Sequence, residues 1–165
     1  MPTKLNFFNK PRKPLKCSGF KKKKRVKSKT TKKYIGSQIK KWHKKCWDLQ
    51  SEIIRRLAHG ICYTCRTGGD WRTRQTGHFI HDKLDFDRRN LHCQCIACNH
   101  YKSGNLGEYA LHLMEDIGIE GVNQLKQDAM HSLSTGLKRM EVEDYQKLYA
   151  ELEFELKNLE AQEII

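Results

Sequence analysis

The segment Cys62–Lys102 reads CYTCRTGGDWRTRQTGHFIHDKLDFDRRNLHCQCIACNHYK and contains two Cys-x-x-Cys pairs separated by 29 residues. The four cysteines are Cys62, Cys65, Cys95 and Cys98. Two such turns each direct two sulfurs at one ion, which is typical of a closed, structural zinc site. We therefore predict Zn²⁺ bound by these cysteines, with redox-active or simply buried thiols as the alternative.

The residues between the two pairs predict a hairpin. One short strand is expected over Gln75–Ile80, with His78 on it, and a second over Asn90–Gln94. A helix is expected to begin after the second pair, with Asn99 in its first turn and Lys102 one turn later. Cys93 is a possible substitute for Cys95, but its spacing to Cys98 does not suit the metal-binding turn. The predicted fold class is α+β, a small zinc-stapled strand–strand–helix core flanked by helices.

Two runs in this segment resemble a known family. They are Thr76-Gly-His-Phe and Asn90-Leu-His-Cys-Gln-Cys-Ile-Ala-Cys-Asn-His-Tyr-Lys-Ser-Gly-Asn105. The pattern resembles the His-Asn-His (HNH) nucleases of the ββα-metal fold, in the variant whose last His is Asn. It is more closely similar to the phage lambda NinG (Rap) recombination proteins. It also resembles the endonuclease VII type, in which an Asn follows the last zinc-binding cysteine. The resemblance is best over Ile39–Ile117.

This resemblance implies a structure-specific DNA endonuclease that cleaves branched intermediates such as Holliday junctions and D-loops, with Mg²⁺ or Mn²⁺ as the catalytic ion. It implies His78 as the general base, a role that imidazole suits near neutral pH; His81 is the alternative base. It further implies that Asn90 orients His78 or braces its loop. Asn99 would offer an amide oxygen to the catalytic metal, and Lys102 would contact phosphate.

The sequence departs from the wider fold at Gly77, because many of its members have a metal-binding Asp immediately before the catalytic His. The second metal ligand is therefore unassigned. The candidates are His81, Asp82, Asp85, Asp87 and His92. His92 is slightly favoured because it lies in the run that carries the resemblance, whereas turn capping or a solvated surface is the better interpretation of the three Asp residues.

Positive charge is concentrated near the N-terminus. Residues 1–47 contain 18 lysines and arginines and no acidic residue. Residues 1–34 have too few apolar side chains to fold alone, so a disordered basic arm that binds DNA phosphates is predicted. A solvated tail or a nuclear-localisation signal in Lys21–Lys27 is the alternative. The predicted DNA contacts are Lys21, Lys22, Lys23, Lys24, Arg25, Lys40, Lys41, Lys44 and Lys45.

Four further helices are predicted around the core. The first spans Ser37–Ala58, because its apolar residues recur every three or four positions; Ser37 would cap its start and Gly60 would suit its end. Cys46 lies on this apolar stripe and is expected to be a buried thiol. The second begins with a capping box at Asn105–Glu108, ends at Gly118, and is followed by a shorter helix near 122–133.

The last helix has a heptad-like stripe from Val142 to Leu159, which favours either a dimerising coiled coil or packing on its own domain. The predicted organisation is a basic arm (1–34), a zinc-containing nuclease domain (35–118) and C-terminal helices (119–165). A homodimer would suit a junction, which offers two related strands to cut.

The composition of the chain argues against a membrane-spanning or secreted protein. No apolar run has the roughly 18 residues of a membrane span, and no signal peptide is visible. Seven cysteines, four of them in metal-binding spacing, favour a reducing compartment, so an intracellular protein is expected, in the bacterial host cytoplasm if phage-encoded. Two alternatives to a junction endonuclease are a non-catalytic zinc-ribbon protein that binds nucleic acid, and an HNH nuclease acting on ordinary duplex DNA.

Overall fold

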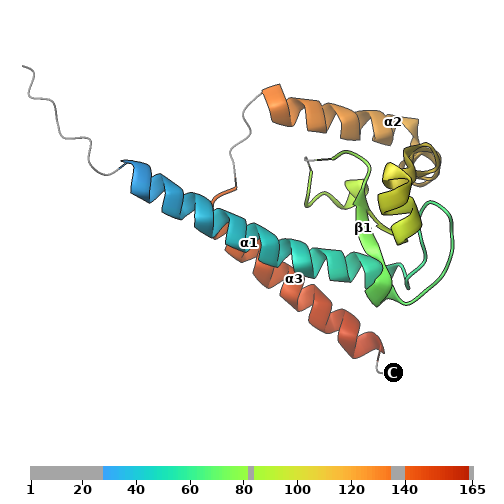
Figure 1. Ribbon diagram of the computed structural model, residues 1–165, viewed down its shortest axis with the longest axis horizontal. Helices are drawn as coiled ribbons and strands as arrows, with labels where there is room; N and C mark the ends of the chain where they lie inside the picture. Colours follow the sequence, from blue (N-terminus) through green and yellow to red (C-terminus); the bar gives the residue numbers. More distant parts are fainter. Residues whose placement is uncertain (1–27, 82–83, 135–139, 164–165) are drawn as a thin grey trace, which may run out of the picture.

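The computed structural model describes residues 28–81, 84–134 and 140–163, in which long helices surround a small β-hairpin (Figure 1). The helices are α1 (Ser28–Leu57), α2 (Leu106–Ser134) and α3 (Val142–Glu163). The strands are β1 (Gln75–His78) and β2 (Leu91–Gln94). Short helical turns are η1 (Trp71–Thr73), η2 (Arg88–Asn90), η3 (Ala97–Tyr101) and η4 (Ser103–Asn105). The α+β class is therefore as predicted.

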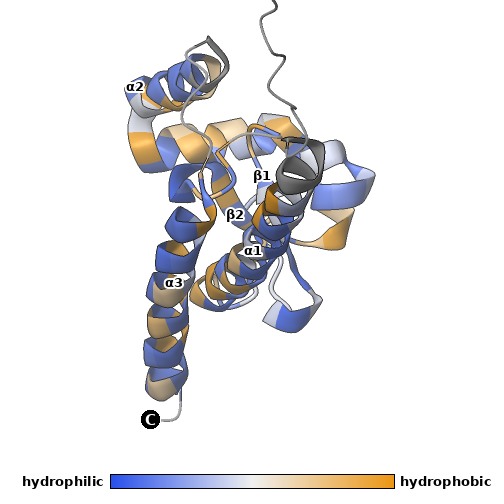
Figure 2. Cartoon of the chain, turned by 90° about the vertical axis from the view of Figure 1, so that its left-hand side faces the viewer, coloured by the Kyte–Doolittle hydropathy of each residue, from blue (hydrophilic) through white to orange (hydrophobic). Residues whose placement is uncertain are grey.

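Helices α1 and α3 lie side by side along much of their length and run in the same direction (Figure 1). Hydrophilic and hydrophobic residues alternate along both helices (Figure 2), and the apolar residues meet between them. The core of this contact is Cys46, Ile53, Tyr145 and Leu152. The stripe on α3 thus packs within its own chain, the second of the two predicted arrangements. Cys46 is a buried thiol, as expected, and donates to the Tyr145 carbonyl at 3.2 Å.

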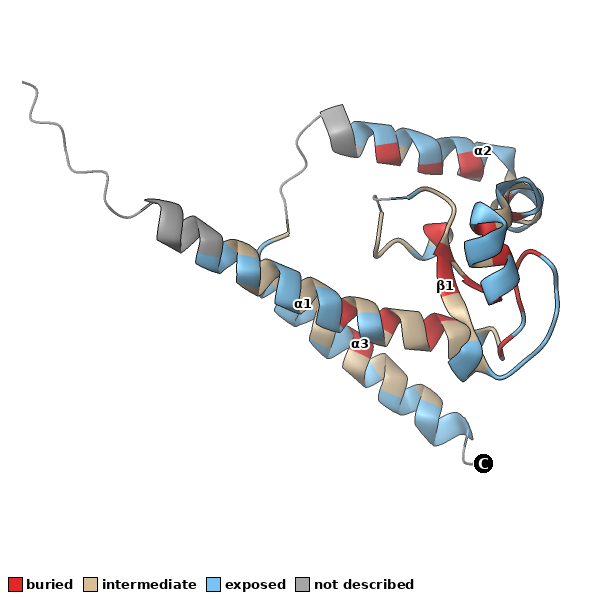
Figure 3. Ribbon diagram, viewed as in Figure 1, coloured by how far each residue is buried: buried red, intermediate tan, exposed pale blue. Residues whose placement is uncertain are grey.

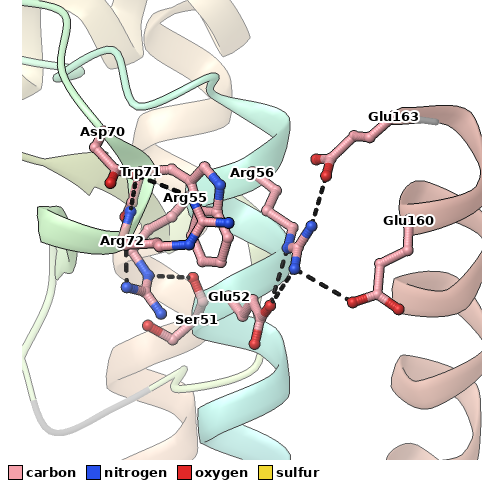
Figure 4. A network of polar contacts seen from close by, with 9 residues as sticks. All are labelled: Ser51, Glu52, Arg55, Arg56, Asp70, Trp71, Arg72, Glu160 and Glu163. Carbon is pink, nitrogen blue, oxygen red and sulfur yellow. Dashed lines mark hydrogen bonds and ion pairs between the residues drawn. The ribbon is translucent and has the colours of Figure 1, made fainter. Parts of the chain in front are cut away.

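A charged cluster joins the C-terminal ends of α1 and α3 (Figure 4). The Arg56 guanidinium lies 2.7 Å from Glu52, 3.2 Å from Glu160 and 2.6 Å from Glu163. Its Cζ atom is also 4.3 Å from the centre of the Trp71 ring, which η1 supplies. Arg56 therefore connects α3 to both α1 and the start of the hairpin region.

Strands β1 and β2 pair antiparallel, as predicted, with Gly77 opposite His92 and His78 opposite Leu91. Because side chains alternate along a strand, His78 and Gly77 belong to opposite faces of the hairpin. The face with His78 packs against α1, where Thr76 bonds to Ser51 at 2.8 Å. The other face lies toward η3 and α2.

Helix α2 covers that second face, and its buried residues lie on the side toward the hairpin (Figure 3). They form a cluster with a residue from the first cysteine turn. The cluster contains Tyr63, Tyr109, Leu113, Val122 and Leu125. Gly118 has the non-helical angles φ 73° and ψ 167°, so α2 consists of two helical segments that meet where the sequence predicted an end.

The predicted start of α1 and the predicted cap of α2 were wrong, although α2 does begin directly after Asn105. Helix α1 already includes Ser28, the first described residue, so Ser37 lies inside the helix and is not its N-cap. Asn105 has a φ of 48° instead of the extended backbone of an N-cap, and its amide points toward Cys98. The predicted arm therefore overlaps α1 over residues 28–34. Lys21–Arg25 lie outside the described residues.

None of the helices in the described ranges is long and apolar enough to cross a bilayer.

Candidate metal centre and neighbouring cavity

Four cysteine sulfurs converge where the turn after α1 meets the end of β2. The sulfur atoms of Cys62, Cys65, Cys95 and Cys98 all lie within 4.8 Å of one another. The Cys65 and Cys95 sulfurs are 3.7 Å apart. Tetrahedral zinc with Zn–S bonds of about 2.3 Å places its sulfurs about 3.8 Å apart, so the cluster has the right size for zinc. The predicted grouping of these cysteines is confirmed.

The local hydrogen bonds favour thiolates at part of this cluster. Burial raises the pKa of the Cys62 thiol, but the backbone N–H of Cys65 and the hydroxyl of Thr64 outweigh burial and the pKa falls to about 6. Burial instead raises the pKa of Cys98 to about 12. The Asn105 amide nitrogen lies 3.9 Å from the Cys98 sulfur, where it can donate to a thiolate. A bound cation would favour the deprotonated form of all four sulfurs.

Cys93 lies outside the cluster and packs with Ile54 and Leu91 against α1. Burial raises the pKa of its thiol to about 11. The choice of Cys95 over Cys93 as the third cysteine of the cluster was therefore correct.

His78 faces a cavity on the α1 side of the hairpin. Its ring stacks on Trp47 with ring centres 4.9 Å apart and an angle of 8° between the planes. Its Nε2 atom lies 3.6 Å from Asp85 Oδ1, and the other oxygen of Asp85 lies 3.0 Å from His43 Nε2. The cavity, about 370 Å³ in volume, is lined by His43, Lys44, Trp47, His78, His81 and Asp85.

Asn90 is fully buried and holds the loop that carries two of these lining residues. Its Oδ1 accepts from the Ile80 N–H at 2.7 Å, and its Nδ2 donates to the Ile80 carbonyl at 3.0 Å. Nδ2 also reaches the Leu84 carbonyl at 3.5 Å. These contacts place His81 and Asp85 beside His78, which agrees with the bracing role predicted for Asn90.

The remaining candidate aspartates differ in position. Asp87 caps η2 through the Arg89 N–H and forms an ion pair with the Arg89 guanidinium at 2.6 Å. Arg89 also reaches Asp128 of α2, so Asp87 has the turn-capping role that the sequence favoured. Asp82 lies outside the described residues.

Asn99 lies on the opposite face of the hairpin from His78. It is in η3, and its Nδ2 donates to Gln75 Oε1 at 2.8 Å. Its Oδ1 is directed at Gly77, 2.9 Å from where a Cβ on that glycine would be. The predicted base, His78, is thus on one face of β1. The predicted metal ligand, Asn99, lies against the preceding residue, Gly77, on the other face.

His92 is in a buried aromatic cluster. Its Nδ1 lies 2.8 Å from the Tyr109 hydroxyl, and its ring stacks on Tyr63 with centres 3.8 Å apart. Burial lowers the pKa of His92 to about 4. A neutral histidine held by two tyrosines joins β2 to α2 and does not line the cavity with His78.

The predicted DNA-binding lysines on α1 have different surroundings. Lys40 and Lys41 are exposed. Lys44 lines the His78 cavity and pairs with Asp48 at 2.6 Å. Lys45 lies over the rings of Trp42 and Tyr149, so it contributes to the α1–α3 contact. Lys102 is exposed immediately after η3.

His43, Trp47 and Gln94 are site residues that the sequence reasoning missed. His43 and Trp47 are one helical turn apart and lie off the main apolar stripe, beside Lys44. That placement of an aromatic ring next to cationic residues was the available signal, but it does not say which loop the helix would meet. Gln94 gave no signal, because a glutamine in a strand is ordinarily exposed.

These features define an α+β protein with a cluster of four cysteines that could hold a metal ion and a separate cavity lined by His78. The family described as "Bacteriophage Lambda NinG protein" matches residues 9–163. The chain belongs to the NinG family. It is 32% identical to Protein ninG of Salmonella phage P22 and 30% identical to Protein ninG of Escherichia phage lambda, in both cases over 125 residues and 72% of this chain.

Protein ninG of Escherichia phage 933W is 31% identical over the same length. The matched segment spans only 57% of the P22 and lambda proteins and 58% of the 933W protein. No solved structure matches the chain. The relation to the ββα-metal fold therefore stays a prediction from the sequence motifs.

Proposed function

We propose that this protein is a metal-dependent DNA endonuclease that cleaves branched recombination intermediates. The observation that carries the proposal is the setting of His78, which lies in a cavity between Trp47 and Asp85. A histidine held by an aromatic ring and a carboxylate is suited to accept a proton from water. Membership of a phage family and the basic N-terminal segment support DNA as the substrate.

In this mechanism His78 removes a proton from a water molecule that attacks the phosphorus in line with the leaving oxygen. Trp47 fixes the plane of the imidazole, and Asp85 stabilises the positive charge that the ring gains. Lys44 lines the same cavity and would contact the phosphate on the attacked strand. Asn90 keeps the loop with Asp85 in position through its buried amide bonds.

Two metals would serve different purposes. The four cysteines fit Zn²⁺ in number, chemistry and separation, and zinc would hold the two turns together. Asn99 would hold Mg²⁺ or Mn²⁺ through its amide oxygen, and this ion would stabilise the negative charge on the phosphate. The structural role of the zinc does not require it to contact DNA.

Shape, more than base sequence, would select the substrate. The exposed residues Lys40, Lys41 and Lys102 would contact phosphates, and such contacts are independent of base sequence. A homodimer would let two copies act on the two related strands of a junction. The host cytoplasm is the expected place of action for a phage protein of this kind.

The test is cleavage of a four-way junction and of a linear duplex with the same arm sequence, with Mg²⁺, by zinc-loaded protein. We expect wild type to cut the junction and His78→Ala to bind it without cutting. His112→Ala is the matched control, because the His112 side chain is also 19% exposed but pairs with Glu115 on α2. It should cut like wild type.

The other outcomes separate the alternatives. Equal cleavage of junction and duplex would favour an HNH nuclease that acts on ordinary DNA. Tight binding without cleavage of either substrate by any divalent ion would leave a zinc-ribbon binding protein.

A further inference from the structure

On the α2 side of the hairpin, the Gln94 side chain fills the space that a side chain at position 77 would occupy. A Cβ on Gly77 would be 1.9 Å from the Gln94 amide oxygen, which is far too close for two atoms that are not bonded. Gly77 is not among the glycines with positive φ, so its backbone does not demand glycine. The absence of a side chain at position 77 therefore makes room for the Gln94 amide.

The orientation of the Gln94 amide is determined by its neighbours. Its nitrogen donates to the Gly104 carbonyl at 2.7 Å and contacts the Thr64 hydroxyl at 3.2 Å. A carbonyl oxygen can only accept, so the amide nitrogen, and not the oxygen, must face Gly104. The Gln94 oxygen consequently points at Gly77.

That oxygen has no hydrogen-bond partner among the described residues, although Gln94 is fully buried. An unsatisfied buried acceptor costs about 1–3 kcal/mol, so such an atom calls for an explanation. Asn99 supplies a second oxygen at the same place, since its Oδ1 is 2.9 Å from the same Cβ position of Gly77. Two amide oxygens from β2 and η3 thus converge over one backbone position.

We propose that Gln94 Oε1 and Asn99 Oδ1 together bind a hard divalent cation of the Mg²⁺ or Mn²⁺ type. Such ions prefer oxygen ligands and commonly keep several waters, with substrate phosphates completing the coordination. Two neutral amides give a weak site in the free protein, and a DNA phosphate would strengthen it. The Gln94 oxygen would supply the second protein ligand, and no carboxylate would be needed at position 77.

The position of this cation site suits the proposed endonuclease. A catalytic role for the cation rests on that proposed function. Gly77 and His78 are consecutive in β1, and β1 pairs with β2 alone among the described strands. A phosphate that reached this part of β1 would meet the cation on one face and His78 on the other. The cation site itself is a separate claim that binding measurements can test.

The experiment is a Mn²⁺ titration of the zinc-loaded full chain, followed by the electron paramagnetic resonance signal of free Mn²⁺, with and without a four-way junction. Gln94→Met keeps the length of the side chain and removes the amide. We expect it to weaken Mn²⁺ binding at least about tenfold, as loss of a ligand or its support does in other metal sites. Gln124→Met removes an exposed amide from α2 and is the matched control, which should bind like wild type.

A second variant guards against misfolding of Gln94→Met. The double substitution Gly77→Asp with Gln94→Ala opens the space for a Cβ and puts a carboxylate where the amide oxygen was. Because a charged ligand replaces a neutral one, Mn²⁺ affinity should rise at least about tenfold above wild type. Zinc content and far-ultraviolet circular dichroism must match wild type for both variants.

The outcomes are distinguishable from those of the cleavage test. If wild type binds Mn²⁺ through Gln94 but cuts no DNA, the cation site stands and the nuclease proposal fails. If wild type cuts DNA while Gln94→Met binds Mn²⁺ equally well, the cation site is wrong. No Mn²⁺ uptake by wild type, free or with junction, also overturns the site and leaves an ordered water as the partner of the Gln94 oxygen.

Discussion

The α1–α3 pair and the segment from Cys62 to Asn105 are stabilised by different forces. The helix pair buries a continuous apolar stripe, with charged contacts such as those of Arg56 at its edge. The cysteine segment has two four-residue strands and several short turns. It buries polar side chains instead, namely Thr64, Thr76, Asn90 and Gln94, together with the cysteine cluster.

This difference indicates why the candidate site lies where it does. Long amphipathic helices can be stable with apolar packing alone, and they provide a rigid wall for the cavity. A segment of turns can direct polar groups to one point, but it has no large apolar core. Hydrogen bonds and the zinc proposed for the four cysteines would stabilise it instead. The site combines both, with His43 and Trp47 from the helix and His78 from the hairpin.

The largest expected effect is loss of the zinc proposed for the cysteine segment. Cys98→Ser, or a strong chelator, should remove up to about 10 kcal/mol of binding-linked folding free energy from this segment. The helix pair does not depend on the metal, so much of the helical circular dichroism should remain. Amide hydrogen exchange checks this by showing rapid exchange in β1 and β2 with protection retained in α1. Cys93→Ser, outside the cluster, should keep stoichiometric zinc.

The helix pair should respond to a different substitution. Leu152→Ala deletes a buried side chain from the α1–α3 contact and should cost about 3 kcal/mol in unfolding free energy, measured with urea. Phe154→Ala is the control, because Phe154 is 69% exposed on the same helix and its loss should be nearly neutral. Equal losses for both variants would contradict the packing described here.

Acid should weaken the hairpin side through His92. Because burial lowers its folded pKa to about 4 from 6.5, protonation favours the unfolded state. The stabilisation by neutral His92 is complete above pH 6.5 and is lost as the pH falls toward 4. The loss in unfolding free energy should reach about 2 kcal/mol by pH 5. Urea unfolding of wild type and His92→Gln at several pH values should show a steeper loss for wild type, and parallel curves would refute this.

The smallest effect concerns the charged contacts at the edge of the helix pair. Arg56→Ala removes the stacking on Trp71 and the ion pairs with Glu52, Glu160 and Glu163. It should lower the free energy of unfolding by about 1 kcal/mol. Part of this cost should disappear at high salt, where the ion pairs are screened. A cost that does not change with salt would assign the contribution to packing on Trp71.

Local patterns predicted much of the fold and part of the site. The cysteine spacing, the hairpin and the interruption at Gly118 follow from short-range rules of turns and strands. The bracing contacts of Asn90 were instead implied by the family resemblance. The start of α1 did not follow from such rules, because helix caps are weak signals where a basic segment has no clear break.

The rest of the site depends on tertiary contacts that spacing does not encode. The stripe on α3 suited a dimer as well as its own α1, and only the folded chain distinguishes them. The cavity forms because α1 packs on the loop with Asp85, 42 residues from His43 along the chain. The need for glycine at position 77, where the Gln94 amide fills the space of a Cβ, likewise cannot be predicted without knowing which side chains meet.

The most direct test of the nuclease assignment is chemical rescue of His78→Gly by imidazole, measured as single-turnover cleavage of a four-way junction with Mg²⁺. The substitution leaves a space beside Trp47 in the cavity that free imidazole can enter. We expect the variant to bind the junction without cutting it, and added imidazole to restore cleavage in proportion to its concentration. Cleavage by His78→Gly at the wild-type rate without imidazole would contradict the assignment of His78 as the base.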